Sequence, residues 1–211
     1  MTRQEKNIKK ILIFDLDGVL INSKTNMKKS WESVQRKFSY KEIKFKKYFN
    51  EIGIPFEEIL KNLKIFKNHK QIKKCYDETS IKNNNLIKFY RGVKKELKIL
   101  YSLNYELCVV TSKDKKRTHI ALKDISHLFT YIQCPQKNLK GKPYPDQILK
   151  LIKKIKLKKK ECVYIGDTHV DYLTSKNAKI DFIFANWGYG NNNKLYTSSI
   201  NRISELKIKI N

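Results

Sequence analysis

Two carboxylates one residue apart, Asp15 and Asp17, follow directly behind the apolar run 11–14. A short run of this kind is typical of a central strand in a parallel sheet, and ligands bind where the carboxyl ends of such strands meet. Side chains at i and i+2 point the same way, so both carboxylates can reach one ligand, while Gly18 lets the chain turn away. Taken alone, the stretch could also be an ordinary Asp-x-Asp-Gly surface turn, although its place behind a predicted buried strand favours a functional pair.

Three further polar clusters also follow predicted strands. They are Thr111-Ser112, Gly141-Lys142-Pro143 and the segment 166–171, which contains Asp167 and Asp171. Because the carboxyl ends of parallel strands meet at one edge of a sheet, we expect these clusters to converge with the first pair of carboxylates. Together they supply a carboxylate nucleophile, a hydroxyl donor, a cation and two more acids. That set fits an anionic substrate and a hard divalent metal ion.

Strand and helix patterns alternate in the second half of the chain, which indicates a parallel sheet with helices on both faces. Strands are expected at 10–14, 106–111, 129–133, 161–165 and 180–185, and helices at 93–103, 115–123, 145–154 and 169–176. A loop is expected at 187–193 and a short final helix at 199–206. The predicted fold class is α/β, a three-layer Rossmann-like parallel sheet with right-handed crossovers.

The stretch between the first strand and Gly92 shows helical patterns only, at 24–38, 40–50, 55–66, 71–78 and 84–90. We therefore expect an inserted α-helical cap at residues 23–89, closing over the tip of the first strand, and an α/β core at 1–22 and 90–211. The aromatic residues of this insertion could form a base-stacking surface. Their helical spacing favours a hydrophobic core instead.

The net charge of +26 is the most unusual bulk property of a chain whose composition is otherwise globular, with 40% hydrophobic residues among 211. A basic chain can bind nucleic acid or anionic membranes. Only five of the 46 basic residues are arginines, however, and the lysines are spread along the whole chain. Lys, Asn and Ile are all frequent and share A/T-rich codons, so genome composition is favoured over a nucleic-acid site as the explanation.

Sequence features that report on cellular location point to the cytoplasm. No apolar stretch approaches the roughly 20 residues that a membrane-spanning helix needs, and the segment 1–10 has no apolar signal-peptide core. None of the cysteines lies in a Cys-x-x-Cys pair, which predicts reduced and mostly buried thiols without a disulfide framework or a zinc site. The cysteines are Cys75, Cys108, Cys134 and Cys162.

With these motifs in this order, the chain resembles the haloacid dehalogenase superfamily, in its phosphatase branch with a helical cap after the first motif. Phosphoglycolate phosphatases and β-phosphoglucomutases are typical members of that branch. The resemblance covers residues 11–190, and the stretches Gly141–Asp146 and Trp187-Gly188-Tyr189 are also similar to the family's phosphatases. It implies the α/β core and the inserted helical cap that the patterns predict.

The resemblance also implies a role for each motif. Asp15 would attack phosphorus and form an aspartyl-phosphate, while Asp17 would protonate the leaving alcohol and then take a proton from water. Thr111 would donate a hydrogen bond to the phosphoryl oxygens, and Lys142 would neutralise their charge and hold the nucleophile in line. The residues expected to contact the substrate besides these are Gly18 and Ser112.

The implied cofactor is Mg²⁺. Its ligands would be Asp15, the backbone carbonyl of Asp17, and Asp167, with Asp171 behind them or acting through water. The metal ion would cancel the repulsion between Asp15 and an incoming phosphate. The superfamily's dehalogenases lack both the metal and the second acid, so the presence of Asp17 argues against dehalogenation.

The function predicted is a Mg²⁺-dependent phosphatase for a small phosphorylated metabolite, such as phosphoglycolate, a sugar phosphate or a nucleotide. A sugar phosphomutase of the same superfamily is the alternative enzyme, and a basic nucleic-acid-binding protein is a third hypothesis from another class. We expect a small phosphate ester as the partner, not nucleic acid and not a membrane. The chain is expected to be a monomer or a homodimer.

One segment and two single residues each have a functional and a structural interpretation. The segment Gly53–Phe56 resembles the loop of the family's cap that meets the substrate, but it is also an ordinary turn before a helix. Lys113 could line the phosphate pocket or begin a solvated helix. His169 lies beside the second acidic motif but is expected to be an exposed loop residue, because Mg²⁺ prefers oxygen ligands.

Overall fold

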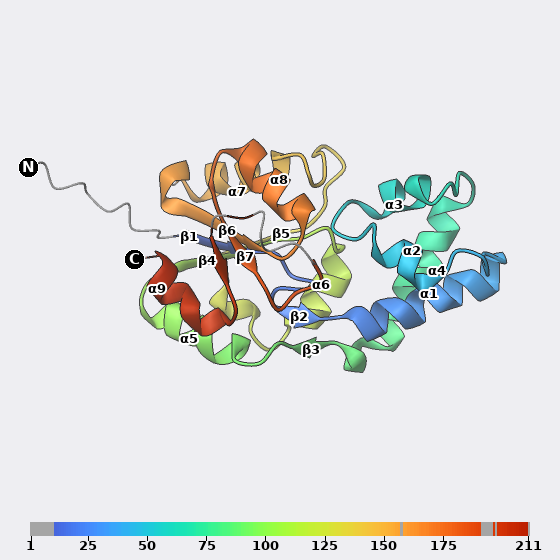
Figure 1. Cartoon of the computed structure of the whole chain (residues 1–211), viewed down its shortest axis with the longest axis horizontal. Coiled ribbons are helices and arrows are strands. Elements are labelled where there is room, and N and C mark those ends of the chain that lie inside the picture. Colours follow the sequence, from blue (N-terminus) through green and yellow to red (C-terminus); the bar gives the residue numbers. More distant parts are fainter. Residues whose placement is uncertain (1–10, 157, 191–195, 197, 211) are drawn as a thin grey trace, which may run out of the picture.

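The computed structural model describes residues 11–156, 158–190, 196 and 198–210. Within them a parallel sheet has the strand order β5-β4-β1-β6-β7-β8, and helices lie on both of its faces (Figure 1). The predicted α/β class is confirmed, and β1 lies inside the sheet between β4 and β6. The strands are β1 (Ile11–Phe14), β4 (Glu106–Val110), β5 (Tyr131–Gln133), β6 (Cys162–Gly166), β7 (Asp181–Ala185) and β8 (Ser199–Ile200).

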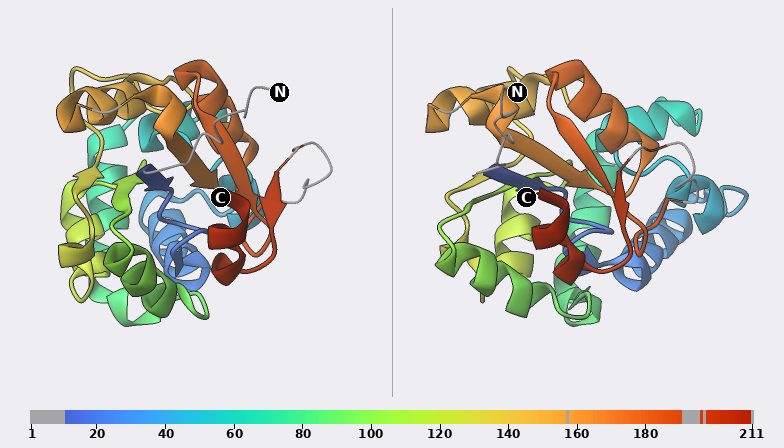
Figure 2. Two further views of the ribbon diagram at one scale, coloured as in Figure 1. Left: turned by 90° about the vertical axis from the view of Figure 1, so that its left-hand side faces the viewer. Right: turned by 60° about the vertical axis from the view of Figure 1, so that its left-hand side comes forward.

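Alternate residues of each strand face opposite helix layers, which explains why the strands are apolar throughout. In β1, Leu12 and Phe14 belong to one hydrophobic cluster, while Ile11 and Ile13 belong to the cluster on the other face. Figure 2 shows the two helix layers on either side of the sheet. The first cluster includes α5 (Val93–Ser102), α6 (Lys115–Leu122) and α9 (Leu206–Ile210), and the second includes α7 (Asp146–Ile155) and α8 (His169–Ala178).

Residues 23–89, called the helical insertion below, contain helices that pack around a hydrophobic cluster of their own. Trp31 is fully buried there. Its ring stacks on Tyr48 with centroids 4.6 Å apart, and its Nε1 donates a hydrogen bond to the carbonyl of Ile43 at 2.8 Å. The helical spacing of the aromatic residues therefore did predict a core. The helices are α1 (Lys24–Phe38), α2 (Phe45–Phe49), α3 (Phe56–Asn62) and α4 (His69–Lys82).

The chain enters and leaves the helical insertion through two short strands that pair with each other. β2 (Ile21–Asn22) and β3 (Lys88–Phe89) are antiparallel, with Ile21 opposite Phe89. The prediction of a helix at 84–90 is wrong, since this stretch has only a 3₁₀ turn at Asn84–Leu86 before β3. The expectation of helices only in this half of the chain missed this pair because it depends on a partner far away in sequence.

The final helix predicted at 199–206 is also wrong, because this segment first forms β8 and then a 3₁₀ turn at Ile203–Glu205 before α9 begins. Within the helical insertion, α2 is shorter than the predicted helix at 40–50, and α3 ends before the predicted residue 66. The remaining predicted strands and helices agree with the structure to within a few residues at their ends. Lys10 and the polar run 191–193 lie outside the described residues.

Two further expectations concern burial and membranes. All four cysteines are buried, as predicted. Among the described residues, none of the helices combines the length and the apolar character that a bilayer crossing requires.

Candidate active site

Asp15 and Asp17 lie where β1 ends, at the carboxyl edge of the sheet. The amide of Asp15 still pairs with the carbonyl of Ile165 in β6, at 2.9 Å, so the strand ladder fixes the direction of its side chain. The chain then turns at Gly18, whose φ is +96°. A Cβ at Gly18 would lie 2.1 Å from Oδ2 of Asp167, so glycine is the residue that lets these two segments meet.

A buried lysine joins the first motif to the last. Nζ of Lys142 is 2.5 Å from Oδ1 of Asp15 and 2.7 Å from Oδ1 of Asp171. Its side chain is 1% exposed, and burial opposes its charge, but the two carboxylates raise the pKa of Lys142 above its usual value. The ammonium group is therefore charged at neutral pH and contacts both acids.

Asp171 is satisfied on both of its oxygens. Besides Lys142, Oδ1 accepts a hydrogen bond from the hydroxyl of Tyr164 at 3.0 Å. Oδ2 accepts from the amide of Thr168 at 3.1 Å and from its hydroxyl at 2.6 Å, forming the N-cap of α8. Burial opposes ionisation, but Lys142 and these hydrogen bonds lower the pKa of Asp171. Its geometry suits a residue that holds Lys142.

The pKa of Asp167 is shifted in the opposite direction to that of Asp171. It is fully buried, and Oδ2 accepts a hydrogen bond from the amide of Tyr189 at 2.6 Å. Within the described residues, Oδ1 has no hydrogen-bond partner. Burial, followed by the charges of Asp171 and Asp15, raises the pKa of Asp167 well above its usual value. The protein alone thus offsets only part of the negative charge that this carboxylate would carry when ionised.

The acidic cluster fits a divalent metal ion. One oxygen from each of Asp15, Asp167 and Asp171 lies within 4.8 Å of the others, and hard divalent cations prefer carboxylate oxygens. The unpartnered Oδ1 of Asp167 is the kind of buried acceptor that a cation would satisfy. Burial also raises the pKa of Asp15 to about 7, against the opposing charge of Lys142. A bound cation would favour the ionised form of this acid.

Thr111 and Ser112 follow β4 at the same edge of the sheet, and their hydroxyls have different partners. Oγ1 of Thr111 accepts a hydrogen bond from the amide of Lys113 at 3.1 Å, so its own proton can point to a ligand. Ser112 donates to the carbonyl of Gly53 at 2.6 Å. Both residues line the pocket, and Ser112 also ties the sheet edge to the helical insertion.

The second acid, Asp17, has a partner from each side of the pocket. Oδ1 accepts a short hydrogen bond from the hydroxyl of Ser23, which precedes α1. Nζ of Lys113 is 3.0 Å from the same oxygen, and the Lys113 side chain is 4% exposed. Lys113 therefore belongs to the pocket and is not at a solvated helix start.

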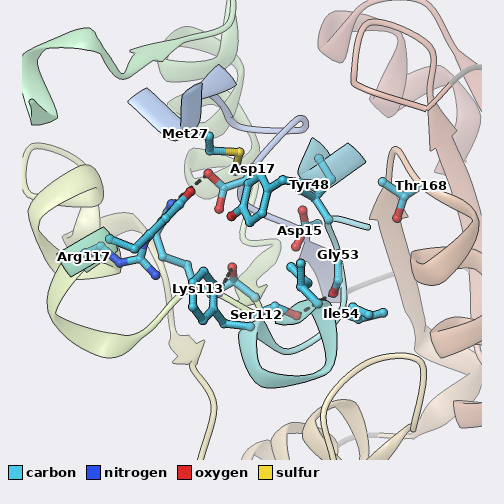
Figure 3. A pocket seen from close by; sticks show the side chains of 15 residues that line it. Asp15, Asp17, Met27, Tyr48, Gly53, Ile54, Ser112, Lys113, Arg117 and Thr168 are labelled. Carbon is cyan, nitrogen blue, oxygen red and sulfur yellow. Dashed lines mark hydrogen bonds and ion pairs between the residues drawn. The ribbon is translucent and has the colours of Figure 1, made fainter. Parts of the chain in front are cut away.

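The helical insertion covers the carboxylates with apolar and aromatic side chains. Figure 3 shows Met27 and Tyr48 beside Asp15 and Asp17 in the pocket. Gly53, Ile54 and Phe56 also line it, while Pro55 precedes α3, so this loop is both a wall of the pocket and a turn before a helix. The cavity has a volume of about 70 Å³, which suits a small ligand.

The convergence of four strand-end motifs under a helical insertion is the arrangement that the sequence resemblance implied. A family model described as haloacid dehalogenase-like hydrolase matches residues 12–185. The chain belongs to the haloacid dehalogenase-like hydrolase family.

Curated relatives of this hydrolase carry phosphatase names. It is 25% identical over 190 residues to pyrophosphatase PpaX from Oceanobacillus iheyensis, which covers 87% of this chain and 86% of that protein. It is 26% identical over 198 residues to phosphoglycolate phosphatase from Haemophilus influenzae, covering 87% of this chain and 88% of that one.

Solved structures share the fold of this hydrolase along nearly its whole length. A haloacid dehalogenase-like hydrolase from Streptococcus pneumoniae superposes with a TM-score of 0.83 at 20% identity, covering 97% of this chain and 99% of that one. A hydrolase from Pseudomonas syringae has a TM-score of 0.83 at 22% identity, with coverage of 94% and 96%.

The hydrolase also places residues in the pocket that sequence reasoning did not single out. Arg117 of α6 lines it, and its guanidinium is 3.2 Å from Asp77 of the helical insertion and 5.2 Å from the centre of the Tyr76 ring. A single arginine on a lysine-rich helix gives no sequence signal for this contact. His169 is exposed, as expected, but it is the first residue of α8 and not part of a loop.

Proposed function

We propose that this hydrolase is a Mg²⁺-dependent phosphatase that moves the phosphoryl group of a small phosphate ester to Asp15 and then to water. The observation that carries the proposal is the buried Lys142, which holds Asp15 at the sheet edge with a second contact to Asp171. A rigidly held carboxylate beside a fixed cation, which a bound metal ion would keep ionised, is an arrangement suited to attack on an anionic centre.

In the first step, a carboxylate oxygen of Asp15 forms a bond to phosphorus while the bond from phosphorus to the alcohol oxygen breaks. Asp17 donates its proton to that departing oxygen. The contacts of Ser23 and Lys113 fall on Oδ1 of Asp17, which leaves Oδ2 to carry the proton.

In the second step, Asp17 is a carboxylate and takes a proton from water. The oxygen of that water bonds to phosphorus, and the bond between phosphorus and Asp15 breaks. This step releases inorganic phosphate and restores the free carboxylate of Asp15 and the protonated Asp17. Thr111 donates its hydroxyl proton to a phosphoryl oxygen, and Lys142 offsets the charge that develops there.

Asp15, the backbone carbonyl of Asp17 and Asp167 would hold the metal ion, with Asp171 behind them. When bound, Mg²⁺ would supply positive charge that offsets the repulsion between Asp15 and the phosphate. The unpartnered oxygen of Asp167 supports this assignment. Each carboxylate oxygen of Asp171 already accepts two hydrogen bonds, which supports its place behind the metal ligands.

We assign residues 23–89 to the cap of this phosphatase, and 1–22 with 90–211 to its catalytic core. The separate hydrophobic cluster of the helical insertion and its place over the carboxylates support this division. The small pocket supports a small leaving group. The names of the relatives make inorganic pyrophosphate and phosphoglycolate the first two substrates to test.

The test is release of inorganic phosphate from a panel of phosphorylated metabolites, including these two, with Mg²⁺ and with EDTA. We expect turnover that requires Mg²⁺ and is lost in Asp15→Asn. Asp124→Asn, which removes an exposed acid paired with Lys94 outside the pocket, is the matched control and should keep full activity. Turnover that survives Asp15→Asn, or no turnover of any substrate by the folded protein, would contradict the proposal.

A further inference from the structure

The loop after β7 returns to the active site at Tyr189. The amide of Tyr189 donates to Oδ2 of Asp167 at 2.6 Å. The flanking glycines make this approach feasible, because a Cβ at Gly188 would lie 2.2 Å from the Cβ of Asp167, and one at Gly190 would lie 2.0 Å from its carbonyl oxygen. The backbone of Tyr189 is thus fixed against the acidic cluster.

The side chain of Tyr189 extends from there to the start of the helical insertion. Its hydroxyl accepts a hydrogen bond from the amide of Ser23 at 2.7 Å and is 3.3 Å from the hydroxyl of the same residue. Ser23 is fully buried and lies between β2 and α1, where the chain enters the insertion. Tyr189 therefore fixes the position of Ser23 from the opposite end of the sequence.

Ser23 in turn contacts the second acid. Its hydroxyl donates to Oδ1 of Asp17, the oxygen that Lys113 also contacts. Two partners on one carboxylate oxygen fix the orientation of the group and leave the other oxygen as the place for an exchangeable proton. The chain of contacts from Tyr189 through Ser23 thus ends at the proposed proton donor.

The ring of Tyr189 also touches the helical insertion itself. It meets Phe49 of α2 edge-on, with ring centroids 5.1 Å apart and an angle of 62° between the rings. Burial raises the pKa of the Tyr189 hydroxyl above its usual value, so the phenol stays protonated. Tyr189 therefore contacts the acidic cluster of the core through its backbone, and the entry to the insertion and the insertion's second helix through its side chain.

We propose that Tyr189 is a positioning residue for proton transfer: its hydroxyl holds Ser23, which orients Asp17 toward the leaving oxygen while the helical insertion covers the pocket. This inference rests on the proposed phosphatase function and adds a residue to it. Loss of the Tyr189 hydroxyl should then slow the reactions that need a proton donor more than those that do not.

A pair of substrates separates these two kinds of reaction. The nitrophenolate of p-nitrophenyl phosphate leaves without a proton, whereas the alcohol of benzyl phosphate is a poor leaving group that must be protonated. Both substrates carry one aromatic ring, so their fit in the pocket is similar. Hydrolysis of the aspartyl-phosphate also uses Asp17 and is common to both substrates, so kcat does not isolate proton donation. The ratio of the two kcat/KM values does, because kcat/KM covers only the steps through transfer to Asp15, and this ratio is insensitive to a general loss of folded enzyme.

The experiment measures kcat and KM for both substrates in wild type, Tyr189→Phe, Ser23→Ala and Ser23→Thr. We expect Tyr189→Phe to lower kcat/KM for benzyl phosphate about tenfold more than kcat/KM for p-nitrophenyl phosphate. Ser23→Ala should show the same selective loss, and Ser23→Thr, which keeps the hydroxyl, should restore most of it. Tyr101→Phe, on an exposed ring, is the control and should change neither.

Two outcomes would overturn the inference. An equal fall in kcat/KM with both substrates in Tyr189→Phe would show that the hydroxyl has a structural role only, and an unchanged kcat/KM with both would show no role. Failure of the phosphatase function is seen separately, as absent Mg²⁺-dependent turnover in the wild type or full turnover in Asp15→Asn. Asp17→Asn sets the scale, since it should give the largest selective loss for benzyl phosphate.

Discussion

The two walls of the pocket differ in the kind of side chain they present. The sheet edge presents charged groups, among them Asp15 and Asp17. Behind Asp15, the buried Lys142 contacts it at 2.5 Å and Asp171 at 2.7 Å. The helical insertion presents apolar and aromatic surface, including Met27 and Tyr48. The edge is suited to bond making and breaking, and the insertion is suited to choosing a leaving group and excluding water.

The difference shows how a fold can keep one chemistry and change its substrate. Buried charges must be paired with good geometry, and the loss of one partner is costly. Strand ends in a hydrogen-bonded sheet supply that geometry. Aromatic contacts such as the stacked pair of Trp31 and Tyr48 tolerate volume-conserving changes more easily. Specificity can therefore change in the insertion while the sheet edge stays the same.

The largest expected effect is at the charged wall. Lys142→Met leaves Asp15 and Asp171 buried together without their shared cation. We expect kcat/KM to fall on the order of 10³-fold and the free energy of unfolding to fall by about 3–5 kcal/mol. Steady-state kinetics and urea unfolding measure the two effects. Lys153→Met, at an exposed site on α7, is the control, and equal behaviour of the two variants would refute the proposed role.

The second prediction compares the stability of the two regions. Cys75 lies in the hydrophobic cluster of the helical insertion and Cys108 in that of the core. In variants that keep one or the other as the sole cysteine, a thiol reagent should modify Cys75 about 100-fold faster under native conditions, because a small cluster opens locally more often than a central strand. Burial also raises the pKa of Cys108 to about 12, which disfavours its thiolate.

Labelling in concentrated urea gives the intrinsic rates and serves as the control for this comparison. Equal native rates for the two thiols, after that correction, would mean that the insertion and the core unfold as one unit.

The third prediction weakens the contact between the two walls. Arg117 belongs to the core, but its guanidinium is 3.2 Å from Asp77 and stacks over Tyr76 in the insertion. Arg117→Met should raise KM about tenfold, with a smaller change in kcat. The helical insertion would then be less firmly attached to the core, and substrate binding would have to supply the free energy of ordering it. Arg117→Lys keeps the charge but loses the planar fork, so its KM should be intermediate. An unchanged KM in Arg117→Met would show that this contact does not contribute to substrate binding.

The smallest expected effect is a pH-dependent change in stability at Asp114, which pairs with Arg117. Burial acts to raise the pKa of Asp114, but the charge and hydrogen bonds of Arg117 outweigh burial and lower it. A depressed pKa stabilises the fold above the pKa of the unfolded chain, about 4, and this contribution is lost as the pH falls further. Asp114→Asn keeps the N-cap of α6, so it should cost at most about 1 kcal/mol at pH 6.

Unfolding by urea at pH 6 and at pH 3 measures that difference. The gap between wild type and Asp114→Asn should narrow at the lower pH, and a gap that stays constant would argue that the carboxylate contributes nothing through its charge.

Sequence patterns located the charged wall well and the apolar wall poorly, for a physical reason. A buried strand followed by an acid is a local signal, and parallel strands bring such acids to one edge, which is why Asp15, Asp17 and Asp167 were predicted to lie together. The hydrogen bond between Tyr189 and Ser23 joins residues 166 positions apart. Nothing local to either residue encodes it.

The bounds of helices and strands were likewise predicted where they depend on local sequence and missed where they depend on distant partners. Lys24–Phe38 was predicted to the residue because its apolar face is periodic over four turns. The strand Lys88–Phe89 was missed because it exists through its pairing with Ile21–Asn22. Likewise, Ser199–Ile200 is a strand because β7 offers it an edge, which outweighs any local preference for a helix.

The antiparallel pair of β2 and β3 places both ends of the helical insertion side by side, with Ile21 opposite Phe89. A segment attached in this way can be lengthened, shortened or exchanged for another without altering how the sheet is threaded, since the sheet sees the same two neighbouring anchor points. The site between β2 and β3 is accordingly a natural graft point, where insertions from other hydrolases could be exchanged to retarget one catalytic edge.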